Sequence, residues 1–169
     1  MDSRLRIAGI VKESIVDGPG IRLVVFAQGC KHNCPGCHNP HTHSFEDGTL
    51  ISIDEIIENV RENPILDGIT LSGGEPFEQA EGFAELAHRI HRLGLNVVTY
   101  TGYTYEHIMD NLDKRKGWKS LIQESDFLID GRFEQSQKNM LLRFRGSENQ
   151  RIIDLRSSAR ENSLVVLNS

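Results

Sequence analysis

The chain has 169 residues, with 19 basic and 24 acidic side chains and a formal charge of -5 at pH 7. This length is typical of one domain, and the acidic balance argues against broad electrostatic binding of nucleic acid or of an anionic membrane. The opening "MDSRLRIAGIVKES" lacks the apolar centre and cleavage site of a signal peptide, and no apolar run reaches the roughly 18 residues of a membrane span. We expect a soluble cytoplasmic protein with a single domain over residues 1–169.

Four short apolar segments predict β-strands at residues 21–26, 68–72, 96–101 and 127–130. Their apolar residues run almost continuously instead of alternating with polar ones. This pattern is typical of strands that are covered on both faces in a parallel sheet.

Amphipathic helices are predicted between these strands. In "SIDEIIENVRENP", Ser52 and Glu55 form a capping box and Pro64 supplies a stop. A second helix ends near Gly94, and a third begins at Thr104. One apolar face marks each helix: Ile53, Ile56, Ile57 and Val60 in the first; Phe83, Leu86, Ala87 and Ile90 in the second; Tyr105, Ile108, Met109 and Leu112 in the third.

The alternation of strands and helices predicts an α/β fold with right-handed crossovers and parallel strands. Composition alone does not distinguish an open sheet from an incomplete barrel. In both architectures, ligands bind at the carboxyl ends of the strands.

All three cysteines lie within eight positions, in "CKHNCPGC", directly after the first predicted strand. In a reducing cytosol, this clustering favours a metal or redox role over a disulfide. Cysteine thiolates bind iron–sulfur clusters, ordinarily four to a cubane cluster, so three thiolates leave one iron open to a substrate. The segments "SGGEP" and "YTGY" follow the next two strands, and we expect all three segments to meet at one mouth.

Other uses of the cysteine loop stay open on the residues alone. The cysteines with His32 or His38 could form a structural zinc site, although zinc motifs usually use two separated ligand pairs. Cys34 and Cys37 could form a redox pair, but that interpretation leaves Cys30 and "SGGEP" unexplained.

The motifs as a set carry a family resemblance. "CKHNCPGC" resembles the cluster loop of radical S-adenosylmethionine enzymes, and "LSGGEP" is similar to their glycine-rich segment. Within that superfamily, the chain resembles the activating proteins of glycyl-radical enzymes, particularly those of the anaerobic ribonucleoside-triphosphate reductase. The matching stretches are "VDGPGIR" (16–22), "GCKHNCPGCHNP" (29–40), "LSGGEP" (71–76), "YTGY" (100–103), "IDGRF" (129–133) and "RFRGSENQRIIDL" (143–155).

The resemblance implies an oxidoreductase of the pyruvate formate-lyase (formate C-acetyltransferase) activating type, with a partial TIM-like β/α barrel. It implies that Cys30, Cys34 and Cys37 bind a [4Fe-4S] cluster whose fourth iron chelates S-adenosylmethionine. A reductant, typically flavodoxin, reduces the cluster. Cleavage of S-adenosylmethionine then yields a 5'-deoxyadenosyl radical that takes a hydrogen from a backbone glycine of the reductase. The cofactors carry this chemistry, so no side chain is expected to act as a general base.

The resemblance also implies which residues line the S-adenosylmethionine pocket. The glycine pair lets the backbone approach a ligand closely, and Glu75 offers an acceptor for a cationic amino group. His38 departs from the family, because many relatives carry an aromatic residue there. The implied pocket residues are Gly36, Cys37, His38, Gly73, Gly74 and Glu75.

Three further segments have more modest interpretations. "DGPG" at residues 17–20 predicts a turn, in preference to a loop that closes over the site. His41 and His43 are expected in an exposed polar loop without a ligand role. Residues 164–167 form either a late strand or an apolar terminus.

Residues 138–160 contain six basic and two acidic side chains, in a chain that is acidic overall. This segment is either a solvated face or a loop that meets the reductase or covers the cofactor. In the second case, Arg143, Arg145 and Arg151 would make the contacts.

Two alternatives to the leading function remain. One is a radical S-adenosylmethionine enzyme that acts on another glycyl-radical enzyme, of the pyruvate formate-lyase type, or on a small molecule. The other is a non-catalytic zinc-binding module. A large enclosed pocket favours a small-molecule substrate, whereas an open mouth favours a protein loop.

Overall fold

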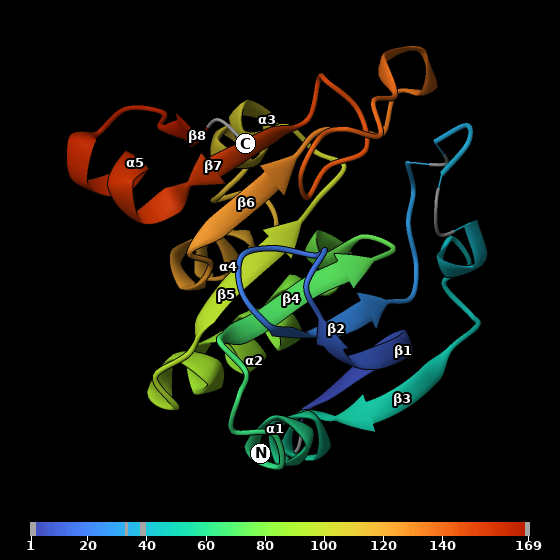
Figure 1. The fold of residues 1–169 in the computed structure, drawn as a ribbon, viewed down its shortest axis with the longest axis vertical. Coiled ribbons are helices and arrows are strands. Elements are labelled where there is room, and N and C mark those ends of the chain that lie inside the picture. The colour runs from blue at the N-terminus through green and yellow to red at the C-terminus, as the bar shows by residue number, and fades with distance from the viewer. Residues whose placement is uncertain (1–2, 33, 38–39, 168–169) are drawn as a thin grey trace.

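A computed structural model describes residues 3–32, 34–37 and 40–167. Within these ranges, eight strands form one mixed sheet with the order β3-β1-β2-β4-β5-β6-β7-β8 (Figure 1). The strands are β1 (Arg4–Ser14), β2 (Arg22–Ala27), β3 (Thr49–Ser52), β4 (Gly68–Gly73), β5 (Asn96–Tyr100), β6 (Phe127–Asp130), β7 (Arg151–Asp154) and β8 (Val166–Leu167).

The four predicted strands are confirmed as β2, β4, β5 and β6, which are neighbours in the sheet and run parallel. Val25 of β2 pairs with Leu71 of β4, which pairs in turn with Thr99 of β5. Every residue of β4 except Gly73 is buried. Burial on both faces explains the continuous apolar pattern from which these strands were predicted.

Antiparallel strands extend the sheet at both edges. β1 pairs with β2 and β3 on one side, and β7 pairs with β6 and β8 on the other. The sequence does not predict β1, β3 or β7, and β8 lies in the segment predicted as a strand or an apolar terminus. The observed architecture is a mixed α/β sheet with a parallel centre.

Five α-helices lie in the described ranges: α1 (Ile53–Arg61), α2 (Ala80–Arg92), α3 (Tyr105–Asp110), α4 (Trp118–Glu124) and α5 (Leu155–Glu161). The first three confirm the predicted helices. Ser52 caps α1 by accepting a bond from the Glu55 N–H, and Thr104 caps α3 by accepting one from the His107 N–H. In the described part of the chain, no helix has the length and apolar character needed to cross a membrane.

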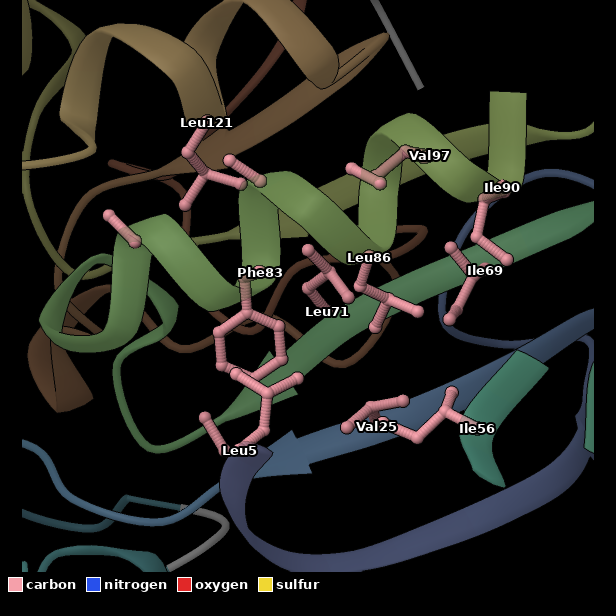
Figure 2. Packing of buried hydrophobic residues seen from close by; sticks show 14 of the residues in the cluster. Leu5, Val25, Ile56, Ile69, Leu71, Phe83, Leu86, Ile90, Val97 and Leu121 are labelled. Atoms are coloured by element: carbon pink, nitrogen blue, oxygen red, sulfur yellow. The ribbon is translucent and has the colours of Figure 1, made fainter. Parts of the chain in front are cut away.

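The main hydrophobic core lies between the sheet and α1, α2 and α4 (Figure 2). Phe83, Leu86 and Ile90 of α2 point toward Ile69 and Leu71 of β4 (Figure 2). All of these side chains are fully buried. Burying such a side chain contributes about 1.5–3 kcal/mol, so this layer is a major source of stability.

The opposite face of the sheet is covered by the loop that joins β1 to β2, which crosses in front of β4 (Figure 1). Arg22 anchors this loop, because its guanidinium is buried and donates to the carbonyls of Pro19 and Ile69 and to the hydroxyl of Thr70. Burial lowers the pKa of Arg22 to about 10. The predicted turn at residues 17–20 is therefore packed onto the sheet.

A cluster of charged groups lies at the amino ends of β5 and β6. The Nε2 of His91 is 2.7 Å from Asp126, and its Nδ1 is 3.1 Å from Glu124. The bond to Asp126 is the main reason that the pKa of His91 is raised. Burial alone would raise the pKa of Asp126, but bonds from His91, Arg156 and the Val97 N–H outweigh it and lower that pKa to about 2.

This cluster predicts a pH-dependent stability. Because the pKa of His91 is raised on folding, its contribution is full below the unfolded value of about 6.5 and is lost as pH rises through the folded pKa. The contribution of Asp126 is present above about pH 4 and is lost as pH falls toward 2. The difference in urea midpoint between the parent and His91→Gln should therefore be larger at pH 6 than at pH 9. His88→Gln, at a more exposed position, is the control. A difference in urea midpoint between the parent and His91→Gln that does not change with pH would contradict the raised pKa of His91.

Candidate functional site

One cavity of about 600 Å³ opens at the carboxyl ends of the parallel strands. Its walls come from the segments that follow β2, β4, β5 and β6, which places "CKHNCPGC", "SGGEP" and "YTGY" at one mouth as predicted. The loop before β2 and residues 140–146 complete the wall. The residues that line it are Ile15, Val16, Asp17, Cys30, His32, Cys34, Cys37, His43, Ser72, Gly73, Gly74, Tyr100, Thr101, Gly102, Gly131, Arg132, Phe133, Met140, Leu141, Leu142, Arg143, Phe144, Arg145, Gly146 and Gln150.

The three cysteines are free thiols, are each partly buried, and line this cavity. The Cys37 N–H donates to the Cys34 carbonyl and closes a turn between the last two cysteines. Burial raises the pKa of Cys34, an effect that a bond from the Phe133 backbone partly offsets. A metal that binds here must therefore displace a proton from this thiol, as metal binding to cysteine generally requires.

A single metal ion and an iron–sulfur cluster need different arrangements of these thiols. In the described ranges, no three His, Cys, Asp or Glu side chains converge on a position for a single ion. A cubane cluster does not require such convergence, since each thiolate binds a different iron. Three thiols on the wall of one cavity therefore fit a [4Fe-4S] cluster.

Gly73 and Gly74 let the base of the cysteine loop lie directly against the end of β4. Gly73 has a φ of +94°, and a Cβ on it would lie 2.5 Å from the backbone nitrogen of Ala27. A Cβ on Gly74 would lie 2.5 Å from the carbonyl oxygen of Gly29. Close packing of the backbone thus requires glycine at both positions, in addition to the predicted role of the pair in letting a ligand approach.

Glu75, predicted as an acceptor for a ligand amino group, is not among the residues that line the cavity. Its carboxylate is fully buried and accepts bonds from the Thr101 hydroxyl, from the Gly102 N–H at 2.8 Å and from the Phe77 N–H at 3.0 Å. Its own N–H donates to the Gly29 carbonyl at 2.8 Å. Glu75 therefore joins the cysteine loop to the ends of β4 and β5.

His32 completes this buried network from inside the cysteine motif. Its Nε2 lies 2.6 Å from Oε1 of Glu75, and its side chain is 4 % exposed. The ring packs edge-on against Tyr103, with the ring centroids 4.5 Å apart. From the sequence, His32 is a candidate only for a zinc ligand, because no local pattern links it to a glutamate 43 positions away.

The remaining predicted site residues are placed as follows. Gly36 has a φ of +72° and lies against the side chain of Gln135, outside the cavity wall. His38 lies outside the described residues. His43 lines the cavity, whereas His41 is exposed as expected.

The basic segment divides into two parts. Arg143 and Arg145 line the cavity, and Arg145 donates to the Gln150 carbonyl. Arg151 instead forms ion pairs with Asp130 and Glu106, and bonds to these carboxylates raise its pKa. Arg151 therefore has a structural role, whereas Arg143 and Arg145 are part of the cavity wall.

Comparisons with known proteins agree with this site. A family model described as a 4Fe-4S single cluster domain matches residues 16–153. The anaerobic ribonucleoside-triphosphate reductase-activating protein of Escherichia coli is 35% identical over 150 residues, which cover 84% of this chain and 94% of the relative. The protein of the same name from Vibrio cholerae is 35% identical over 144 residues, which cover 80% and 89%.

Two other proteins are similar over shorter stretches. The pyruvate formate-lyase-activating enzyme of Clostridium pasteurianum is 37% identical over 117 residues, which cover 64% of this chain and 49% of the relative. The crystal structure of QueE from Escherichia coli has a TM-score of 0.48 and 16% identity, with 60% of this chain and 53% of that chain covered.

The motifs, the cavity and the comparisons lead to one assignment. The 4Fe-4S model spans the segment that contains the three cysteines and the ends of all four parallel strands. The matches to the proteins of Escherichia coli and Vibrio cholerae cover most of this chain and most of each relative. The chain belongs to the family of anaerobic ribonucleoside-triphosphate reductase-activating proteins.

Proposed function

We propose that the protein is a radical S-adenosylmethionine activase that generates a glycyl radical on the anaerobic ribonucleoside-triphosphate reductase. Relatives that bear this activating name align over most of the chain. The observation that carries the proposal for this chain is that all three cysteine thiols and the glycine pair line one cavity. Thiol ligands and an accessible backbone therefore face the same small space.

The cofactors are a [4Fe-4S] cluster and S-adenosylmethionine. Cys30, Cys34 and Cys37 would hold the cluster. When bound and reduced, the cluster supplies the electron that cleaves S-adenosylmethionine, and the resulting 5'-deoxyadenosyl radical takes a hydrogen atom from the partner's glycine. The chain's own residues would bind and orient the reactants.

The proposed S-adenosylmethionine pocket comprises Gly36, Cys37, His38, Gly73, Gly74 and Glu75, of which Cys37, Gly73 and Gly74 line the cavity. The cavity volume of about 600 Å³ lies within the range of small-molecule sites. Because protein donors hold the Glu75 carboxylate in place, its part in this pocket would be to fix the end of β4 beside the ligand.

A protein substrate is favoured over a small molecule by the open mouth. Ile15 and Met140 line the cavity and are 73% and 87% exposed, so the cavity is open to solvent on their side. A glycine in a folded partner needs such an opening to reach the reacting atoms.

We also propose a flavodoxin-like reductant, a cytoplasmic location, and a single domain over residues 1–169. We propose further that the parallel strands form part of an incomplete TIM-like β/α barrel. The run of four parallel neighbours, with the main core on one face, supports this last assignment.

The activity is tested by anaerobic reconstitution with iron and sulfide, followed by reduction and addition of S-adenosylmethionine. The parent protein should be brown and should form 5'-deoxyadenosine. Cys34→Ala should reduce this product at least about a hundredfold, because an iron that loses its thiolate no longer belongs to a stable cluster. His41→Ala, an exposed change in the same segment, should leave the yield unchanged.

Two results would contradict the proposal. One is a parent protein that assembles a cluster but forms no 5'-deoxyadenosine even when the reductase is present. The other is a colourless parent that binds zinc tightly and assembles no cluster, which would make the cysteine loop structural.

A further inference from the structure

The mouth of the cavity carries an unusual concentration of exposed apolar side chains. Ile15, Val16, Met140 and Leu141 are 73%, 69%, 87% and 91% exposed. No other large hydrophobic residue in the described ranges exceeds 54%. All four line the same cavity, and we call them the apolar rim.

The two halves of the apolar rim come from distant parts of the chain. Ile15 and Val16 lie in the loop between β1 and β2, and Met140 and Leu141 lie between β6 and β7. The fold brings these two pairs, which are distant in the sequence, to the same opening. Exposed apolar groups gathered from separate loops mark an interaction site more often than scattered surface residues do.

Hydrogen bonds hold the second half of the apolar rim in place. The Asn139 N–H donates to the Gly146 carbonyl, and the Leu141 N–H donates to the Asn139 side chain. At the base of this turn, the Gln150 side chain accepts from the N–H groups of Gly146 and Ser147. The turn therefore presents Met140 and Leu141 outward as a defined feature.

Further contacts fix this turn to the sheet. The Gln150 amide donates to the Gly131 carbonyl, and the Tyr100 hydroxyl donates to the Phe144 carbonyl. Gly131 and Tyr100 lie at the ends of β6 and β5 and line the cavity themselves. The position of the apolar rim is thus coupled directly to the site.

Positive charge accompanies the apolar rim. Arg132 and Arg143 are exposed and line the same cavity. In the part of the chain that the structure describes, neither guanidinium has an ion pair, and Arg143 lies over the Phe144 ring at 4.8 Å. Asp17 is also at the mouth and accepts a bond from the Ser14 hydroxyl. The two arginines favour a partner that carries carboxylates.

We infer that the apolar rim is the docking surface for the reductase segment that presents the glycine, and that this segment has apolar side chains beside the glycine and a carboxylate that meets Arg143. The inference rests on the proposed function, in which the glycine must enter the cavity to come near the cysteines. Residues that flank this glycine must then pass between the two halves of the rim. Binding energy from groups remote from the reacting atoms places the substrate there.

The test measures the affinity of the reconstituted protein for the intact reductase. The double variant Met140→Gln/Leu141→Gln should bind the reductase at least about tenfold more weakly, since buried apolar anchors dominate such interfaces. Arg143→Glu should also weaken binding, and more strongly at low salt than at high salt. Ile65→Gln removes an apolar side chain that is 54% exposed and lies outside the cavity, and should leave the affinity unchanged.

Three results would overturn the inference. One is a double variant that binds the reductase as tightly as the parent. Another is a parent that sediments as a dimer while the double variant is a monomer with unchanged affinity for the reductase, since the rim would then join two copies of this chain. The third is equal weakening by Ile65→Gln. Failure of the proposed function is a separate result, namely a parent that forms no 5'-deoxyadenosine.

Discussion

Replacement of Glu75 by leucine is expected to destabilise the protein by about 3–5 kcal/mol and to prevent stable assembly of the cluster. The leucine leaves His32, Thr101 and two backbone N–H groups buried without their acceptor. Removal of one member from a buried polar network has a cost of this size, because the others lose their partner and do not regain water. Urea unfolding and the iron content after reconstitution give the two measurements.

Two control variants show how much of the effect of Glu75→Leu comes from the lost hydrogen bonds. Glu75→Gln keeps an acceptor oxygen and should lose less stability than Glu75→Leu. Glu81→Gln changes a glutamate whose side chain is 60% exposed and should change the free energy of unfolding by less than about 0.5 kcal/mol. A Glu75→Leu protein within about 1 kcal/mol of the parent would show that the network contributes little.

Replacement of Gly74 by alanine is expected to displace the cysteine loop from the end of β4. The new Cβ would lie 2.5 Å from the Gly29 carbonyl oxygen and 2.8 Å from that of Thr42, and neither backbone group is the flexible end of a side chain. The bond from the Glu75 N–H to the Gly29 carbonyl must then lengthen or break. We expect a loss of about 1–3 kcal/mol in stability and a larger loss in iron content.

Gly9→Ala is the matched control for this change. A Cβ on Gly9 has no atom within 4 Å in the described structure, so this variant should keep both stability and iron content. Amide hydrogen exchange should show faster exchange at Gly29 and Cys30 in Gly74→Ala, because these N–H groups donate to Thr42 and His43 in the parent. Unchanged exchange at these two amides would contradict the expected displacement.

The parallel centre of the fold was predictable because its signals are local. Strands buried on both faces have continuous apolar runs, and the faces of α1 and α2 repeat at helical spacing. β1 is harder to predict, since only Leu5 and Ile7 of its 11 residues are buried and its pairing with β2 is irregular. The edge strands depend on neighbours that are distant in the sequence.

The sequence predicts which segments come together at the site more accurately than it predicts the contacts of each side chain there. The cysteine loop and the glycine pair meet as predicted, because the carboxyl ends of parallel strands share one edge. The orientation of Glu75 was not predictable from its motif, since Thr101 and Gly102, after the next strand, supply its donors. The apolar rim had no periodic signal, because its residues lie in loops.

The most direct test of the account is electron paramagnetic resonance of the reductase after incubation with the reconstituted protein, S-adenosylmethionine and a reductant. The reductase should carry deuterium on the Cα of its glycines. We expect a glycyl radical on the reductase and deuterium in the 5'-deoxyadenosine, and neither of them with Cys34→Ala. Formation of 5'-deoxyadenosine with no deuterium and no radical on the reductase would contradict it, because the chain would then cleave S-adenosylmethionine without activating this partner.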